Sequence, residues 1–259
     1  MKSAIGCFGE LIGLLGSKKP ALFLDYDGTL TPIVLNPADA SISGRTKRLL
    51  EEAKRKFPVA IISGRDLKDL MDRVGVEGIA YAGSHGLEIA FTNGERKQLV
   101  NEIQKCLGEV EVAESELRHL TKSFNGAIVE RKRFGVALHY RAVGAERIGE
   151  LLKLFDEIAS RHPLLRRSEG KMVVELSGSG ANKGTAISEI MKHEGISEMR
   201  HIPIFIGDDL TDEDGFRAVK HIGAGIIVGD APKQTAADYC LKDQEEVQKF
   251  LEKLVDSTH

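Results

Sequence analysis

The chain has 259 residues, 42% of them hydrophobic, which is long enough to bury one large α/β core or a core with a smaller inserted domain. Its 36 basic and 39 acidic residues give a formal net charge of -3, which gives no reason to expect a nucleic-acid partner. The three separated cysteines argue against disulfides and a thiolate zinc site, and no apolar run reaches membrane-spanning length, so we expect a cytoplasmic protein without a membrane partner.

Short apolar runs alternate with helical patterns through residue 92. After a short N-terminal helix, the runs 21–25, 58–62 and 79–83 are typical of buried strands. Ser43 and Asp66 are placed to cap the helices between these strands. Continuous apolar strands that alternate with amphipathic helices predict a parallel sheet covered on both faces.

The pattern changes in residues 93–178. Asn93-Gly94 is a strong hairpin signal, and a helix–strand–strand unit then occurs twice. The expected helices are 100–121 and 145–161, and the expected strands are 127–132, 134–141, 164–168 and 171–177. This repetition predicts a small α+β insert with two helices and an open-faced sheet.

The parallel pattern resumes after the insert. A helix from Lys183 precedes apolar runs at 203–207 and 224–228, a short strand at 238–241 and a terminal helix. We therefore predict an α/β fold with a Rossmann-like, doubly wound parallel sheet. Its core comprises residues 1–92 and 179–259, and the insert comprises residues 93–178.

Two acidic clusters follow apolar strands. Asp25 and Asp27 stand at the end of the first strand, where ligands bind in open α/β sheets, and Gly28 allows a tight turn. Asp208 and Asp209 end another strand. Because the carboxyl ends of parallel strands share one edge, the clusters can converge, and their repulsion calls for a cation. A hard, oxygen-seeking ion such as Mg2+ suits them.

Other strand and helix ends supply groups for an anion. Ser63 follows the second strand and can donate its hydroxyl to a phosphoryl oxygen, and the amide of Gly64 comes next. Lys183 opens a helix and can neutralise charge on a transferring group. Together with the carboxylates, these groups indicate phosphoryl transfer through an aspartyl-phosphate.

The motifs DYDGTL, ISGR and GDDLTDED, with the intervening lysine, resemble those of the haloacid dehalogenase superfamily of phosphatases. The longer segments DYDGTLTPIVLNPADA, GSHG, VERKRFGVALHYR and GDDLTDEDGFRAV resemble more closely its trehalose-6-phosphate phosphatase family. The match covers about residues 21–228, in order and at family spacing. It implies a magnesium-dependent enzyme of trehalose biosynthesis that hydrolyses trehalose 6-phosphate. We expect the protein to be a monomer.

The resemblance implies a role for each matched residue. Asp25 would be the nucleophile and Asp27 the general acid and base. Mg2+ would be held by the Asp25 carboxylate, the Asp27 main-chain carbonyl and the Asp208 carboxylate, while Ser63, Gly64 and Lys183 would bind the phosphoryl group. The insert would be a cap domain for sugar recognition, with candidate contacts Lys132, His139, Arg141 and Glu175.

Several alternatives stay open. Asp209 and Asp212 could orient Asp208 or simply cap the next helix. Residues Leu176 to Gly178 replace an Arg-Pro pair found in many family members, which leaves the hinge after Glu175 unspecified. The substrate could be another sugar phosphate, such as sucrose phosphate or mannosyl phosphoglycerate. A non-enzymatic phosphosugar sensor is a further alternative, which the retained acids, serine and lysine disfavour.

Overall fold

The computed structural model describes residues 1–34, 39–99, 103–230 and 234–258. The chain divides into unit 1, Met1–Gln98 with Asn182–His259, and unit 2, Leu99–Ala181. Unit 2 begins later than the insert expected at 93–178, because β6 (Arg96–Gln98) pairs with β5 (Glu88–Ala90) in the sheet of unit 1. It also ends three residues later, at Ala181. The turn at Asn93-Gly94 thus extends the core rather than opening the insert.

Within the described residues, unit 1 contains a nine-stranded sheet in the order β1-β13-β12-β11-β2-β3-β4-β5-β6. Neighbouring strands pair in parallel except at β4–β5 and β5–β6. The remaining strands are Lys2–Ser3 (β1), Lys19–Leu24 (β2), Val59–Ile62 (β3), Ala80–Gly83 (β4), His201–Gly207 (β11), Ala224–Val228 (β12) and Tyr239–Leu241 (β13). The expected parallel sheet is confirmed, and it gains an antiparallel edge and the two-residue strand β1, which is too short to leave a pattern in the sequence.

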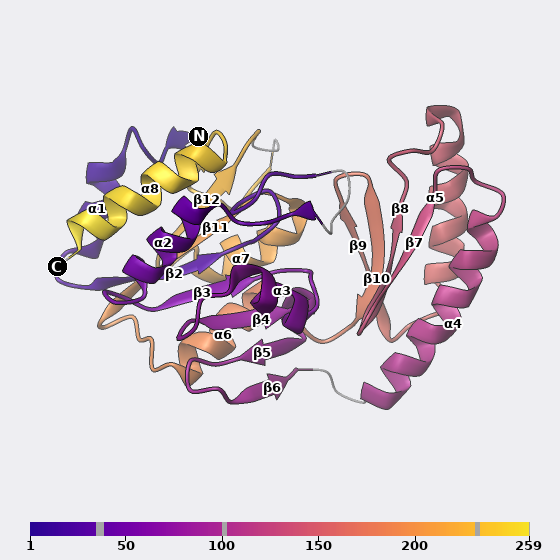
Figure 1. Cartoon of the computed structure of the whole chain (residues 1–259), viewed down its shortest axis with the longest axis horizontal. Helices are drawn as coiled ribbons and strands as arrows, with labels where there is room; N and C mark the ends of the chain where they lie inside the picture. The colour runs from indigo at the N-terminus through magenta and orange to yellow at the C-terminus, as the bar shows by residue number, and fades with distance from the viewer. Residues whose placement is uncertain (35–38, 100–102, 231–233, 259) are drawn as a thin grey trace. The chain divides into compact units, whose positions relative to one another are not determined.

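Helices pack on both faces of this sheet (Figure 1). Side chains alternate along β2, so Leu22 and Leu24 enter an apolar cluster with one set of helices while Phe23 faces the other way. On that second face the ring of Phe216 packs against the ring of Phe205 in β11, with 5.2 Å between the two ring centroids. The first set is Phe8–Leu15 (α1), Gly44–Ala53 (α2), Leu67–Val74 (α3) and Gln244–Ser257 (α8), and the second is Lys183–His193 (α6) and Glu213–Val219 (α7). The predicted doubly wound α/β core is confirmed.

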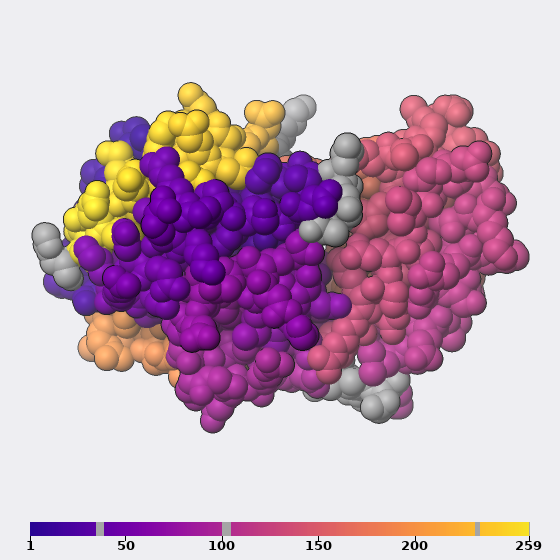
Figure 2. All heavy atoms as spheres, in the orientation of Figure 1, coloured from indigo at the N-terminus to yellow at the C-terminus, as the bar shows by residue number. Residues whose placement is uncertain are grey.

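Both ends of the chain contribute to unit 1. Ser43 caps α2, because its Oγ accepts a hydrogen bond from the Thr46 amide at 3.0 Å. Arg45, in the first turn of that helix, pairs with Glu252 of α8 at 2.8 Å. The C-terminal helix, yellow in Figures 1 and 2, consequently lies against early segments of the chain.

Unit 2 has the predicted helix–strand–strand repeat. Its four-stranded antiparallel sheet has the order β7-β8-β10-β9. The elements are Ile103–Thr121 (α4), Ile128–Lys132 (β7), Gly135–His139 (β8), Ala145–Ala159 (α5), Leu165–Gly170 (β9) and Val173–Gly178 (β10). Both helices pack on one face of the sheet, where Leu138 and Val174 are buried. In the described part of the chain, no helix combines the length and apolar character needed to cross a membrane.

Candidate active site

The end of β2 places Asp25 beside the end of β11. Leu24 pairs with Ile206, and the Asp25 amide donates to the Ile206 carbonyl at 2.8 Å. Asp25 is only 4% exposed. Burial raises the pKa of Asp25 well above its ordinary value; Lys183 opposes this, and the neighbouring Asp212 and Asp208 add to it. Asp25 therefore occupies a site where its charge requires compensation.

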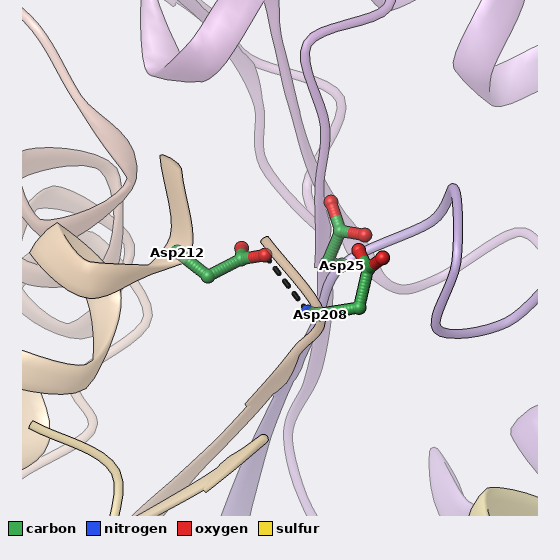
Figure 3. A group of neighbouring side chains, drawn as sticks. All are labelled: Asp25, Asp208 and Asp212. Carbon is green, nitrogen blue, oxygen red and sulfur yellow. Dashed lines mark hydrogen bonds between the residues drawn. The ribbon is translucent and has the colours of Figure 1, made fainter. Parts of the chain in front are cut away.

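Asp208 and Asp212 flank this carboxyl group. Asp208 directly follows β11, and Asp212 lies in the next turn, Leu210–Asp212. The Asp212 Oδ2 accepts hydrogen bonds from the amides of Asp208 and Asp209, each at 2.9 Å, which fixes the turn. Carboxylate oxygens of Asp25, Asp208 and Asp212 lie within 4.8 Å of one another (Figure 3). The two acidic clusters thus converge, as their positions at strand ends predict.

Lys183 is a buried cation within this cluster. The side chain of Asn182 accepts a hydrogen bond from the Thr185 amide at 2.9 Å, and this capping box starts α6 at Lys183. The Lys183 Nζ donates to Asp25 Oδ1 and to Asp212 Oδ1, each at 2.6 Å. Burial lowers the pKa of this ammonium, but Asp212 and Asp25 raise it more, and the net pKa lies above the ordinary lysine value. Lys183 therefore remains charged.

The charge of the cluster fits a divalent ion. With all three carboxyl groups ionised, the single ammonium of Lys183 leaves two negative charges in this buried site for a divalent ion to offset. Asp212 already accepts bonds from Lys183 and two amides, so Asp25 and Asp208 are better placed to supply ligand oxygens. Few carboxylates in a compact oxygen site suit Mg2+, which keeps some of its waters.

Gly28 brings the turn after β2 directly over Asp208. Its φ is +86°, and a Cβ on Gly28 would stand 2.1 Å from Asp208 Oδ2. Glycine alone combines that backbone conformation with so close an approach. The turn is also tied to α8, since Gln244 Nε2 donates to the Gly28 carbonyl.

Ser63 and Gly64 directly follow β3, the strand next to β2. Ser63 is buried, and its Oγ accepts a hydrogen bond from the Arg65 amide at 3.1 Å. A Cβ on Gly64 would stand 2.6 Å from His85 Nε2, so the imidazole lies directly against this backbone. His85 and Ser84 both have positive φ, at 56° and 49°. Backbone strain in two adjacent non-glycine residues is typical of a functional site.

Among the residues that the structure describes, the Asp27 side chain makes no hydrogen bond or ion pair with the buried cluster. Its two carboxylate oxygens accept bonds from Arg65, Nε to Oδ2 at 2.8 Å and Nη2 to Oδ1 at 2.7 Å. From the sequence, Asp209 and Asp212 had the same two possible roles. In the structure Asp209 caps the turn that follows it, because its Oδ1 accepts a hydrogen bond from the Leu210 amide at 2.6 Å. Asp212 contacts Lys183, and a carboxylate oxygen of Asp212 lies within 4.8 Å of one of Asp25, the candidate nucleophile.

In unit 2 the register places three of the four candidate sugar contacts on one face. Glu175 pairs with Ala137, and Ala137 pairs with Glu130. Lys132 lies two residues after Glu130 in β7, and His139 lies two residues after Ala137 in β8. Both side chains are therefore on the same face as Glu175. This face is opposite to the one that α4 and α5 cover, where Leu138 is buried.

Polar pairs organise this open face. Lys132 Nζ donates to Glu175 Oε2 at 2.5 Å, and Glu130 Oε2 lies 2.7 Å from His139 Nε2. Arg141 lies past the end of β8 and donates to the Lys171 carbonyl at 3.2 Å. Glu130 was absent from the sequence-based set. The two-residue alternation along β7 could have found it, because it puts Glu130 and Lys132 on one face.

Comparisons with known proteins agree on one family. The family model described as trehalose-phosphatase matches residues 23–245. The chain is 34% identical to trehalose-phosphate phosphatase B of Arabidopsis thaliana, over 98% of this chain and 71% of that protein. It is 36% identical to the trehalose-phosphate phosphatase of Mycobacterium tuberculosis, over 98% of this chain and 66% of that protein. In fold it resembles the C-terminal domain of the C. albicans trehalose-6-phosphate phosphatase, with a TM-score of 0.87, 24% identity and 100% coverage of both chains.

Proposed function

The chain belongs to the trehalose-phosphatase family, and from that premise we propose that it hydrolyses trehalose 6-phosphate to trehalose and phosphate through an aspartyl-phosphate. The observation that carries this proposal is the buried cluster of Asp25, Lys183, Asp212 and Asp208 at the carboxyl edge of the sheet. Such a cluster supplies a nucleophile and the charge compensation that phosphoryl transfer needs. The cytoplasmic location and the monomeric state stay predictions.

Asp25 is the nucleophile in this mechanism. A carboxylate oxygen of Asp25 bonds to phosphorus as the bond from phosphorus to the sugar oxygen breaks. Lys183 holds Asp25 Oδ1 at 2.6 Å, which orients the carboxylate, and its charge favours the ionised form of the nucleophile. Ser63 and the Gly64 amide at the adjacent strand end would bind phosphoryl oxygens.

Asp27 is the proton carrier. It protonates the departing sugar oxygen in the first step. In the second step it takes a proton from the water that attacks phosphorus and releases Asp25. A side chain that is 42% exposed, as that of Asp27 is, can reach both the leaving group and solvent water.

Mg2+ is the implied cofactor. Asp25 and Asp208 would hold it with their carboxylates, and Asp27 with its main-chain carbonyl. When bound, the ion would offset the two surplus negative charges of the cluster and the charge of the phosphoryl group.

The open face of unit 2 would recognise the sugar. Hydroxyl groups suit side chains that offer both donors and acceptors, and Lys132, Glu175, Glu130 and His139 supply both on one face. These side chains pair with one another in the structure, Lys132 with Glu175 and Glu130 with His139.

Phosphate release from a panel of sugar phosphates, with Mg2+ and with a chelator, tests the proposed function. We expect trehalose 6-phosphate to have the highest kcat/KM, the chelator to abolish turnover, and Asp25→Asn to be inactive. Equal rates on sucrose phosphate or mannosyl phosphoglycerate would contradict the substrate. Tight binding of trehalose 6-phosphate with no turnover would instead indicate a sensor.

A further inference from the structure

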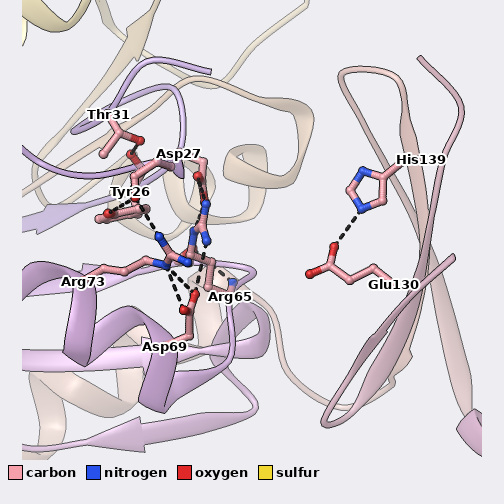
Figure 4. Close-up of polar contacts among 10 residues, drawn as sticks. Tyr26, Asp27, Thr31, Arg65, Asp69, Arg73, Glu130 and His139 are labelled. Carbon is pink, nitrogen blue, oxygen red and sulfur yellow. Dashed lines mark hydrogen bonds and ion pairs between the residues drawn. The ribbon is translucent and has the colours of Figure 1, made fainter. Parts of the chain in front are cut away.

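Asp27 is oriented by a single guanidinium. Arg65 donates to both of its carboxylate oxygens, at 2.8 and 2.7 Å (Figure 4). Paired bonds of this kind fix the plane of a carboxylate as well as its position. Since the Asp27 side chain is 42% exposed, it has little packing to orient it, and the pair with Arg65 provides that constraint.

Arg65 is itself held firmly. Its side chain is 11% exposed, and its Cζ lies 5.2 Å from the centroid of the buried Tyr26 ring. Its Nη1 donates to Asp69 Oδ2 at 3.2 Å, and both oxygens of Asp69 accept from Arg73 Nε at 2.8 Å. Arg73 in turn donates from Nη1 to the Ala40 carbonyl at 2.9 Å. A chain of contacts thus runs from α3 to Asp27.

Arg65 stays charged in this environment. Burial lowers the pKa of the guanidinium, but the bonds to Asp27 and Asp69 raise it more. The pair also leaves Asp27 able to carry a proton. The two bonds from Arg65 use one lone pair on each carboxylate oxygen of Asp27, and each oxygen keeps a second lone pair that can accept a proton.

We propose that Arg65 is a positioning residue for the reaction, which aims the Asp27 carboxylate at the leaving sugar oxygen and then at the attacking water. The inference rests on the proposed function, because that function gives Asp27 its role. One proton passes from Asp27 to the sugar oxygen as the bond to phosphorus breaks. One proton returns from water to Asp27 as the water oxygen bonds to phosphorus, and Arg65 keeps all of its protons throughout.

A structural ion pair would make the same contacts but act on activity differently. If Arg65 only stabilises the loop, its removal should lower activity whether or not Asp27 can carry a proton. If it acts through Asp27, its removal should cost nothing once Asp27 is disabled. A double-mutant cycle separates these cases.

The cycle compares wild type, Arg65→Met, Asp27→Asn and the double variant, by kcat and KM for trehalose 6-phosphate. Misplacement of a reacting group by about 1 Å can cost roughly 100-fold. We expect Arg65→Met to lower kcat by about that factor with KM changed less than about threefold, and the double variant to match Asp27→Asn within about twofold. Equal losses from Arg65→Met in both backgrounds would overturn the proposal.

Further variants guard against a folding defect. Arg65→Lys keeps the charge but not the planar fork, so its kcat should fall between those of wild type and Arg65→Met. Asp69→Asn removes a charged partner of Arg65 and leaves the Asp27 side chain unchanged. We expect it to lower kcat less than Arg65→Met does, and to have no effect on kcat in the Asp27→Asn background. Lys68→Gln, an exposed site on the same helix, should leave kcat unchanged.

A second substrate separates failure of the inference from failure of the proposed function. The same cycle is run with p-nitrophenyl phosphate. If wild type cleaves only this substrate, the sugar assignment fails while the coupling of Arg65 to Asp27 is still measured. If wild type cleaves neither substrate, both proposals are wrong.

Discussion

The ammonium of Lys183 donates to Asp25 Oδ1 at 2.6 Å, with both side chains buried. The same ammonium donates to Asp212 at 2.6 Å. These two bonds join the start of α6 to the end of β2 and to the turn Leu210–Asp212 that follows β11. The nucleophile of the proposed reaction is thereby fixed by a group more than 150 residues away in the chain, since 158 positions separate the two residues.

Lys183→Met should abolish turnover and destabilise the protein in the absence of metal. The change removes the positive charge that contacts both Asp25 and Asp212, and breaking a buried ion pair costs about 3–5 kcal/mol. We expect kcat to fall by at least about 100-fold, as for loss of a charge-stabilising group. Thermal unfolding and phosphate release measure the two effects. A variant with wild-type kcat would contradict the role of Lys183.

Gly28→Ala should disrupt the acidic cluster, and Gly94→Ala is its matched control. Both glycines have a φ near +85°, at 86° and 85°, so both variants meet the same backbone penalty of about 1–2 kcal/mol. A Cβ at Gly28 would also meet Asp208 Oδ2 at 2.1 Å, whereas one at Gly94 has no neighbour within 4 Å.

We therefore expect Gly28→Ala alone to lose activity and stabilisation by Mg2+. Thermal unfolding at rising Mg2+ concentrations measures the stabilisation, because a ligand of the folded state raises Tm by mass action. Equal activity of the two variants would show that the contact with Asp208 does not matter.

Glu175→Gln should weaken recognition of the sugar without impairing the chemistry. Glu175 is buried and pairs with Lys132, so the neutral amide loses a charged acceptor. We expect KM for trehalose 6-phosphate to rise about tenfold, which corresponds to about 1.4 kcal/mol, with the rate on p-nitrophenyl phosphate unchanged. Glu169→Gln, on the opposite face of the same sheet, is the control. It should change neither KM for trehalose 6-phosphate nor the rate on p-nitrophenyl phosphate. A parallel loss on both substrates would argue against a role in sugar binding.

The pair of Glu130 and His139 should make part of the stability of unit 2 depend on pH. The hydrogen bond with His139 lowers the pKa of Glu130 below its ordinary value of 4.5, although burial opposes this. A depressed folded-state pKa gives stability that is present above the unfolded value and is lost as pH falls through the folded value. The pair is partly exposed, so its contribution is at most about 1 kcal/mol.

Comparison of wild type with Glu130→Gln tests this dependence. We expect wild type to have the higher Tm at pH 7 and the difference to disappear in acid, below the folded pKa of Glu130. Added salt should also reduce the difference at pH 7. A difference that does not vary with pH would mean that the charge of Glu130 does not stabilise unit 2.

The order of the elements and the convergence of the acids could be predicted from the sequence. Apolar runs end at Asp25 and Asp208, and parallel strands bring such ends to one edge, so local pattern and chain direction were sufficient. The helix–strand–strand repeat of unit 2 was predictable for the same reason, because each element is long enough to show its period. The sequence pattern places the residues after Asn93-Gly94 in the insert, because a hairpin signal does not say which sheet its second strand will join; in the structure β6 joins the sheet of unit 1.

The partners of side chains depended on tertiary structure. The strand-end pattern does not distinguish Asp27 from Asp25, and the family resemblance assigns their roles but not their partners: Asp25 pairs with Lys183 and Asp27 with Arg65. Asp209 and Asp212 also looked alike, and only Asp212 contacts Lys183. Sequence by itself determined which chemical groups gather at the sheet edge, because that follows from strand ends. Only the tertiary structure decided which charges pair, because angstrom-scale distances between residues far apart in the chain are set by packing and not by local pattern.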